Sequence, residues 1–166
     1  SLPDITLSAQ EGSEMPELVA GRLHRRWQEL ATFVDGLPTL PSQKDIVRRL
    51  KPVRADKSLL HMDFRRANFR VHEGEVQGLL DWSNALIGHP ALELARVAET
   101  GETGQAFLDG YASVKDLPDV TPDIETILRL DTATMLALVF LSEDPDPERA
   151  PAAVDRVLEL RKSLAL

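Results

Sequence analysis

Residues 59–95 read LLHMDFRRANFRVHEGEVQGLLDWSNALIGHPALELA, and the prediction of the fold depends on this stretch. Between its two polar segments, apolar residues alternate with polar neighbours on either side of a Glu-Gly pair, which predicts an antiparallel β-hairpin. The polar residues of interest lie before and after this hairpin: His61, Asp63, Arg65, Asn68 and Asp81. A hairpin brings its two ends together, so we expect Asn68 and Asp81 to lie close to each other.

The oxygen atoms of this stretch predict a particular kind of site. Asp63 lies on the loop immediately before Asn68, so two carboxylates and one amide oxygen are expected to converge. Mg²⁺ prefers carboxylates, waters and substrate phosphates as ligands. The stretch therefore indicates a phosphate and magnesium site.

The same residues resemble a known family. His61-Met-Asp63, with Asn68 five positions after the aspartate, is similar to the catalytic loop of kinase-like folds, and Asp81 occupies the position of their metal-binding aspartate. The run Asp81-Trp, then Gly-x-Pro at 88–90 and Glu-Leu-Ala at 93–95, resembles the aminoglycoside phosphotransferase family. Leu23-His24 in the first predicted helix is also similar to the helical lobe of that family.

The resemblance implies an ATP- and Mg²⁺-dependent phosphotransferase that acts on a hydroxyl of a small molecule. It implies that Asp63 is the catalytic base or orients the acceptor hydroxyl, and that Asn68 and Asp81 hold Mg²⁺ against the nucleotide phosphates. Arg65 is expected to place a cation beside the transferring phosphoryl group, or else to form a surface ion pair. His61 is expected in the catalytic loop, where bracing by hydrogen bonds is favoured over acid–base chemistry.

Three departures from the family pattern qualify these roles. Met62 stands where the family usually has glycine, which raises the question of whether the loop backbone can follow its usual path. His89 and Glu93 replace aspartates that are common in the family. No glycine-rich phosphate loop and no strand with an ATP-orienting lysine precede the helical part.

The fold class predicted from these features is α+β and mostly helical: a kinase-like C-terminal lobe with a catalytic-loop hairpin, without the N-terminal β-rich lobe. Residues 1–14 are expected to be a lead-in or linker, and residues 15–166 to form the lobe. The missing N-terminal lobe is then the expected partner. Without it, nucleotide affinity is expected to be weak and the lobe is expected to be inactive alone.

Apolar periodicity and capping signals predict the surrounding helices. The first runs from Pro16 to a point before Gly36, and Ser42 caps a short second helix that ends at Leu50. Later helices are expected from Pro90 to Gly101, from Thr103, from Thr121-Pro122, and from Asp146-Pro147. Asp131, on the apolar stripe of the long helix, must find a partner if it is buried, and a structural role is favoured for it.

Two other functions remain open. The first is a non-catalytic binding or regulatory module derived from a kinase, which Met62 and the absent lobe motivate. The second is a metal-dependent hydrolase that uses His61, Asp63, Asp81 and His89, although this leaves the spacing of Asp63 and Asn68 unexplained. His24 is expected to be a structural histidine, and the basic residues Arg48, Arg49, Lys51 and Arg54 are expected to form a solvated face.

Composition limits the possible partners. The chain has 166 residues, 43% hydrophobic and 28% charged, with a net charge of −8 and no cysteine. The negative charge disfavours nucleic acid as a partner. No apolar run reaches the roughly 18 residues of a membrane span. The lack of cysteine excludes disulfides and thiolate chemistry. A cytoplasmic protein is expected. Neither the acceptor nor the oligomeric state can be read from the sequence.

Overall fold

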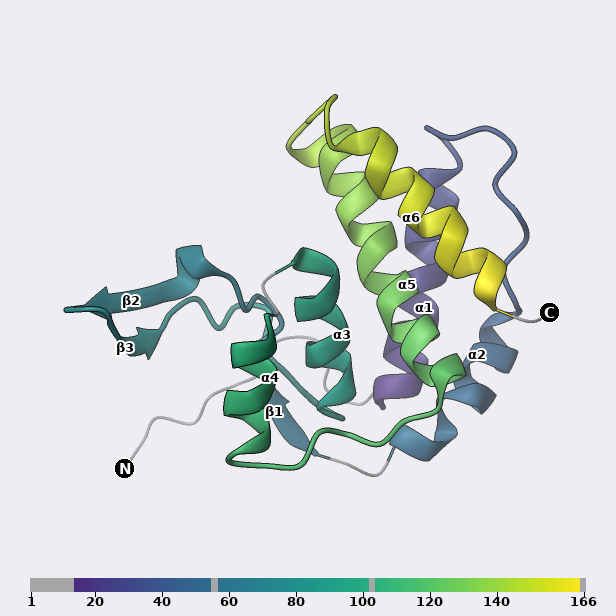
Figure 1. The fold of residues 1–166 in the computed structure, drawn as a ribbon. Helices are drawn as coiled ribbons and strands as arrows, with labels where there is room; N and C mark the ends of the chain where they lie inside the picture. The colour runs from purple at the N-terminus through teal and green to yellow at the C-terminus, as the bar shows by residue number, and fades with distance from the viewer. Residues whose placement is uncertain (1–13, 55–56, 102–103, 165–166) are drawn as a thin grey trace.

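The computed structural model describes residues 14–54, 57–101 and 104–164 (Figure 1). Its helices are α1 (Met15–Leu30), α2 (Gln43–Arg49), α3 (Ala91–Thr100), α4 (Gln105–Ala112), α5 (Pro122–Leu138) and α6 (Ala150–Ser163). Its strands are β1 (Ser58–Leu60), β2 (Phe69–His72), β3 (Glu75–Leu79) and β4 (Leu86–Gly88). The fold is mixed α and β and mostly helical, as predicted. The expected lead-in, apart from Glu14, lies outside the described residues.

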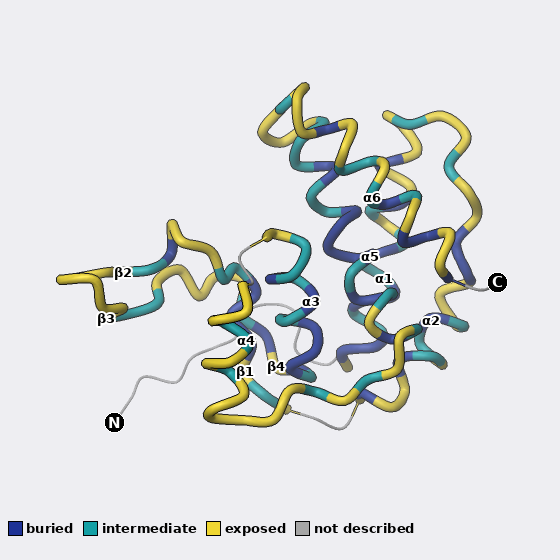
Figure 2. Tube along the Cα trace, in the orientation of Figure 1, coloured by how far each residue is buried: buried dark blue, intermediate teal, exposed yellow. Residues whose placement is uncertain are grey.

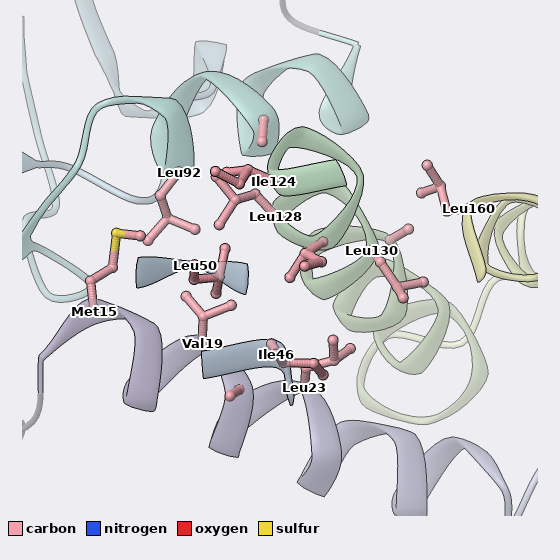
Figure 3. Close-up of a cluster of buried hydrophobic side chains, with 14 of the residues drawn as sticks. Met15, Val19, Leu23, Ile46, Leu50, Leu92, Ile124, Leu128, Leu130 and Leu160 are labelled. Atoms are coloured by element: carbon pink, nitrogen blue, oxygen red, sulfur yellow. The ribbon is translucent and has the colours of Figure 1, made fainter. Parts of the chain in front are cut away.

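Helix α5 is the centre of the helical part. Thr121 accepts a hydrogen bond from the backbone N–H of Ile124, and Pro122 occupies the first turn, so the helix starts where the sequence predicts. It packs against α1, α3 and α6 (Figure 1). Figure 3 shows the apolar side chains that meet around it, including Val19, Leu23, Ile46, Leu50, Leu92, Leu128 and Leu130. None of the described helices is long and apolar enough to cross a membrane.

The helix boundaries differ from the predicted ones where local signals compete with packing. Helix α1 ends at Leu30, and the residues up to Gly36 form turns. Helix α6 begins at Ala150, because Asp146 instead caps a turn, with Oδ1 accepting the N–H groups of Glu148 and Arg149. Helix α3 ends at Gly101, which has φ 76° and is suited to a left-handed cap, as predicted.

Two separate strand pairs carry the segments on either side of the predicted site. Strands β2 and β3 form the expected antiparallel hairpin, in which Phe69 pairs with Leu79 and a bulge lies between Arg70 and Val71. The hairpin projects away from the helices and is exposed toward its tip (Figures 1 and 2), where Val71 is 57% and Val76 61% exposed.

Strands β1 and β4 form a second antiparallel pair, which the sequence did not predict, with Leu59 opposite Ile87. Residues 86–88 were expected to be loop, because three residues are too few to show an alternating pattern. The pairing places the segment after Asp81 beside the strand that leads into His61. The polar segment after β1 and the polar segment after β3 are therefore held side by side by two strand pairs, the β2–β3 hairpin and the β1–β4 pair.

Short irregular helices complete the surroundings of the site. Two 3-10 turns, η1 (Lys51–Val53) and η2 (Arg66–Asn68), precede β1 and β2, and a π-helical segment, η3 (Val139–Glu143), extends α5. Helix α4 contributes no buried residue. The ring of Phe107 is half-buried and packs edge-on against Phe64 of the polar loop, with the ring centroids 5.3 Å apart. The predicted start of this helix, Thr103, lies outside the described residues.

Candidate active site

The loop that follows β1 begins with a backbone conformation that favours glycine. Met62 has φ 65°, in the left-handed region, and its side chain is only 2% exposed within the core. This answers the question raised by the missing glycine, because the methionine adopts the left-handed conformation itself. Such a conformation costs a non-glycine residue roughly 1–2 kcal/mol, and burial of the thioether side chain in the core opposes that cost.

Glu93, in the first turn of α3, holds this loop in place. Its Oε2 accepts the backbone N–H of His61 at 2.9 Å, and its Oε1 accepts that of Met62 at 2.6 Å. Both N–H groups belong to buried residues, so each needs an acceptor. The sequence marked Glu93 only as a departure from the family's aspartate. An acidic residue in the first turn after Gly-x-Pro was the available signal, but its partner in the loop could be identified only from the structure.

Asp63 and Asn68 are in direct contact. The amide nitrogen of Asn68 donates to the backbone carbonyl of Asp63 at 2.8 Å and to its carboxylate Oδ2 at 2.9 Å. Nε of Arg65 lies 3.3 Å from the same Oδ2. The Asp63 side chain is 18% exposed, so its carboxylate reaches solvent while its partners fix its orientation. Its Oδ1 has no hydrogen-bond partner among the described residues.

His61 links the loop to the segment after the hairpin. Its Nε2 lies 2.9 Å from the carbonyl oxygen of Leu80, and its Nδ1 accepts the backbone N–H of Asp63 at 3.2 Å. These partners assign a neutral ring that donates from Nε2. The ring also meets the edge of Trp82, with the centroids 4.7 Å apart. His61 is buried, and both of its nitrogens are occupied by backbone groups, which is the geometry of a brace.

Asp81 lies on a tight turn after the hairpin. Its φ is 61°, a conformation that Asp tolerates better than most residues, and its Oδ1 accepts the N–H and the hydroxyl of Ser83 at 3.3 and 2.6 Å. These bonds from Ser83 hold the pKa of the Asp81 carboxyl below its ordinary value. The backbone N–H of Leu80, the preceding residue, donates to the carbonyl of Asn68 at 2.8 Å. The hairpin thus brings Leu80, the residue before Asp81, into contact with Asn68.

Asn68 and Asp81 each have a side-chain oxygen of the kind that binds a hard cation. Because the Asn68 amide nitrogen points to Asp63, its Oδ1 is left without a hydrogen bond among the described residues. The same is true of Asp81 Oδ2. An amide oxygen and a carboxylate oxygen are suitable ligands for Mg²⁺, which also retains waters and binds phosphates.

The hydrolase hypothesis has no support in the geometry. Within residues 14–54, 57–101 and 104–164, no three His, Cys, Asp or Glu side chains gather as ligands for a metal. Both His61 nitrogens are already engaged, and Nδ1 of His89 accepts the N–H of Ala91 at 3.2 Å. A histidine can bind a metal only through a nitrogen with a free lone pair.

A pocket of about 1160 Å³ lies beside Asp63. Loop residues Met62 to Arg65 and residues 83–86 line it together with side chains of α1, α3, α5, η3 and α6. The volume exceeds the roughly 300–1000 Å³ of typical small-molecule sites, as expected of an open cleft. Asp63 and Arg65 line it, whereas Asn68 and Asp81 do not.

A buried ion pair supports the pocket. Asp131 of α5 is 1% exposed and binds two arginines of α1: Nε of Arg22 lies 3.1 Å and Nη1 of Arg26 2.8 Å from its Oδ1. Burial raises the pKa of Asp131, but the two guanidinium groups outweigh burial and hold the pKa below its ordinary value. The expectation that a buried Asp131 finds a partner is confirmed.

Other polar residues noted in the sequence lie away from this cluster. Nε2 of His24 is 3.1 Å from the carbonyl of Pro41, as expected of a structural histidine. The basic residues after α1 form ion pairs at the surface: Arg48 with Asp45, Arg49 with Asp123, and Arg54 with Glu14 and Glu17. None of them lines the pocket.

A carboxylate held by an asparagine five residues later, with a second carboxylate on the turn after a hairpin, is an arrangement typical of phosphoryl-transfer enzymes. Comparison with protein families agrees with this class. The model of the phosphotransferase enzyme family matches residues 3–122, more than half of the chain, so the chain belongs to this family. The matched range ends at the start of α5, and it includes every residue of the cluster around Asp63. A comparison with curated proteins finds no match.

Proposed function

We propose that this protein is a small-molecule kinase that transfers the γ-phosphoryl group of ATP, with Mg²⁺, to a hydroxyl of a small acceptor. The observation that carries the proposal is the carboxylate of Asp63, which lines the pocket while Asn68 and Arg65 hold it. Membership of the phosphotransferase family supports the reaction class. In this proposal the helices and the loop–hairpin–loop segment correspond to the C-terminal lobe of a kinase-like fold, and a β-rich N-terminal lobe covers the nucleotide.

Asp63 acts on the acceptor in this proposal. Asn68 and Arg65 both approach Oδ2, which leaves Oδ1 to accept a hydrogen bond from the acceptor hydroxyl and then its proton. In phosphoryl transfer, catalysis comes mainly from positioning and from neutralising charge. The rigid attachment of Asp63, through the His61 and Glu93 hydrogen bonds to its loop, serves the positioning. Arg65 supplies positive charge beside the same carboxylate.

Asn68 and Asp81 hold the metal in this proposal. Their Oδ1 and Oδ2 atoms, respectively, are the oxygens that the surrounding hydrogen bonds leave available. When bound, Mg²⁺ neutralises charge on the nucleotide phosphates. The bonds from Ser83 to Oδ1 favour this role, because they fix the orientation of the Asp81 carboxylate.

The test is phosphoryl transfer followed by ³¹P NMR. The protein together with the N-terminal lobe that this proposal requires is incubated with ATP, with or without Mg²⁺, and with a mixture of polyols, amino sugars and sugar acids. We expect a phosphomonoester signal that requires Mg²⁺ and that Asp63→Asn reduces by about 10²–10⁴-fold, the usual contribution of a general base. Asp119→Asn, an exposed carboxylate in the α4–α5 loop, is the matched control. Equal turnover by Asp63→Asn and the unmodified chain would refute the proposal.

The alternative of a non-catalytic module rested partly on Met62. Because Met62 adopts a left-handed conformation of the kind that glycine favours, the methionine is compatible with such a turn and no longer favours the alternative. No other described contact favours it over the kinase.

A further inference from the structure

The pocket beside Asp63 has a strongly basic wall. Arg22 and Arg26 reach it from α1, and Arg96 reaches it from α3, one turn after Glu93. Two carboxylates act on them: Asp131, which pairs with Arg22 and Arg26, and Asp63, which attracts Arg96. Three guanidinium groups with two carboxylates leave this wall with a local excess of positive charge, although the chain as a whole has a net charge of −8.

Two of the three arginines are paired inside the protein. Arg22 contacts both oxygens of Asp131, through Nε and Nη2. Arg26 donates from Nη1 to the carboxylate and to the backbone carbonyl of the same residue. The N–H groups that form these bonds point toward α5. Arg22 and Arg26 therefore contribute positive charge to the pocket more than free hydrogen-bond donors.

Arg96 is different, because its guanidinium makes no hydrogen bond and no ion pair with any described residue. The other arginines that line the pocket and lie outside the Asp131 cluster each have an acidic partner: Arg65 with Asp63, Arg149 with Asp146, and Arg156 with Glu99. Arg96 is therefore the lining cation, among the residues described, whose five N–H donors are all available to a ligand.

The surroundings of Arg96 make this an unfavourable place for an unpaired charge. Burial, followed by repulsion from Arg22 and Arg26, lowers the pKa of Arg96 to about 10. The guanidinium is nonetheless charged at neutral pH. Arg96 is half-buried, and a cation that is partly withdrawn from water is costly unless an anion compensates it. Asp63 attracts Arg96 electrostatically but forms no ion pair with it, so the two groups face the same pocket without neutralising each other.

We infer that Arg96 binds an anionic group, a carboxylate or a phosphate, of the acceptor whose hydroxyl is presented to Asp63. A planar guanidinium with free donors suits either anion, because it can form two parallel hydrogen bonds. The acceptor class is therefore a hydroxylated acid or a hydroxylated phosphate ester. This inference rests on the proposed function, since it takes the pocket to be the acceptor site.

Acidic residues also line the pocket. Glu143, Asp144 and Glu148, from η3 and the turn before α6, are among the lining residues and are exposed to solvent. An acceptor that also carries an amino group can place that group there. The charge requirement beside Asp63 is set by Arg96, and so an acceptor that carries only positive charge is excluded from this position.

The test needs neither nucleotide nor turnover. Sodium sulfate is titrated into the ¹⁵N-labelled chain at constant ionic strength maintained with sodium chloride, and the arginine Nε–Hε signals are followed by NMR. We expect a saturable shift of the Arg96 signal, identified by its loss in Arg96→Met. The apparent affinity for sulfate, measured from amide shifts around the pocket, should fall roughly tenfold or more in Arg96→Met. It should fall less in Arg96→Lys. Arg48→Met, an exposed arginine outside the pocket, is the control and should bind like the unmodified chain.

A second titration distinguishes the sources of the anion. Glucuronate, glucose 6-phosphate, glucose and glucosamine present a carboxylate, a phosphate, no charge and an ammonium group on similar rings. Preference for glucuronate assigns a carboxylate, and preference for the phosphate ester assigns a phosphate. A sulfate response no larger than that of chloride, or one that Arg96→Met leaves unchanged, would overturn the inference, as would displacement of sulfate by ATP and Mg²⁺. Loss of phosphoryl transfer with sulfate binding intact would instead refute the proposed function alone.

Discussion

Replacement of Met62 tests the strained start of the catalytic loop. Met62 combines a buried side chain with φ 65°, so two opposing effects act at one position. Removal of the side chain forfeits its burial, whereas removal of Cβ relieves the left-handed backbone. The pair Met62→Ala and Met62→Gly separates these effects, because both variants lose the side chain and only the second loses Cβ.

The magnitudes decide the order of stability. Truncation of a buried methionine to alanine costs about 2–5 kcal/mol, and with the side chain only 2% exposed this full range applies. Glycine at this φ recovers about 1–2 kcal/mol of left-handed strain but loses about 0.4–1 kcal/mol to the entropy of the unfolded chain. We therefore expect Met62→Gly to be less stable than the unmodified protein and more stable than Met62→Ala, by up to about 1.6 kcal/mol.

Urea unfolding followed by circular dichroism at 222 nm measures these differences. Ala95→Gly, within α3, is the matched control. Glycine is ordinarily less stable than alanine in a helix, so this variant should lose about 1 kcal/mol in the free energy of unfolding. If Met62→Gly proves less stable than Met62→Ala, as Gly is relative to Ala within α3, the left-handed conformation is absent. If Met62→Gly matches the unmodified protein, the buried side chain contributes nothing. Either result would refute the reasoning.

Three further substitutions test the contacts around the site. Glu93→Gln turns an amide toward one of the loop N–H groups, so we expect a loss of about 1–3 kcal/mol in the free energy of unfolding and faster hydrogen exchange at the His61 amide; unchanged exchange would count against the brace. Asp131→Asn leaves two partly buried arginines without their carboxylate and should cost about 3–5 kcal/mol. Because the folded pKa of Asp131 is lowered, its contribution is present above the unfolded pKa of about 3.9 and is lost as the pH falls through the folded value. Denaturation of the two proteins between pH 7 and pH 3 should therefore show a shrinking difference, and a constant one would contradict the sign. Ser83→Ala should raise the pKa of Asp81 toward its ordinary value in a ¹³C-detected titration, since the Ser83 bonds are the main cause of its lowering.

The central stretch could be read from the sequence because its signals are local. Alternation on either side of Glu73-Gly74 defines the hairpin, and the hairpin alone brings Asn68 and the segment before Asp81 together. Thr121 and Gly101 likewise mark helix ends through their own backbone preferences. Patterns of this kind depend on neighbours a few residues apart, which a sequence displays directly.

The contacts that the sequence did not reveal join distant segments. Glu93 lies about thirty residues from the loop N–H groups it accepts, and β4 forms only because β1 lies beside it. Arg22 and Arg26 meet Asp131 across more than a hundred residues. No local pattern encodes such partners, because any acidic residue in a first helical turn looks the same in sequence.

The sequence by itself determined the family, the mostly helical fold class and the set of candidate residues in residues 59–95, because the spacing of polar groups around a hairpin is a local property. The tertiary structure alone decided that Met62 takes a left-handed backbone conformation, that Glu93 holds the loop, and that Arg96 lies in the same pocket as Asp63 without a partner among the described residues. The physical reason is that burial and the pairing of charges depend on which helices pack together. Those neighbours come from parts of the chain that are far apart until it folds.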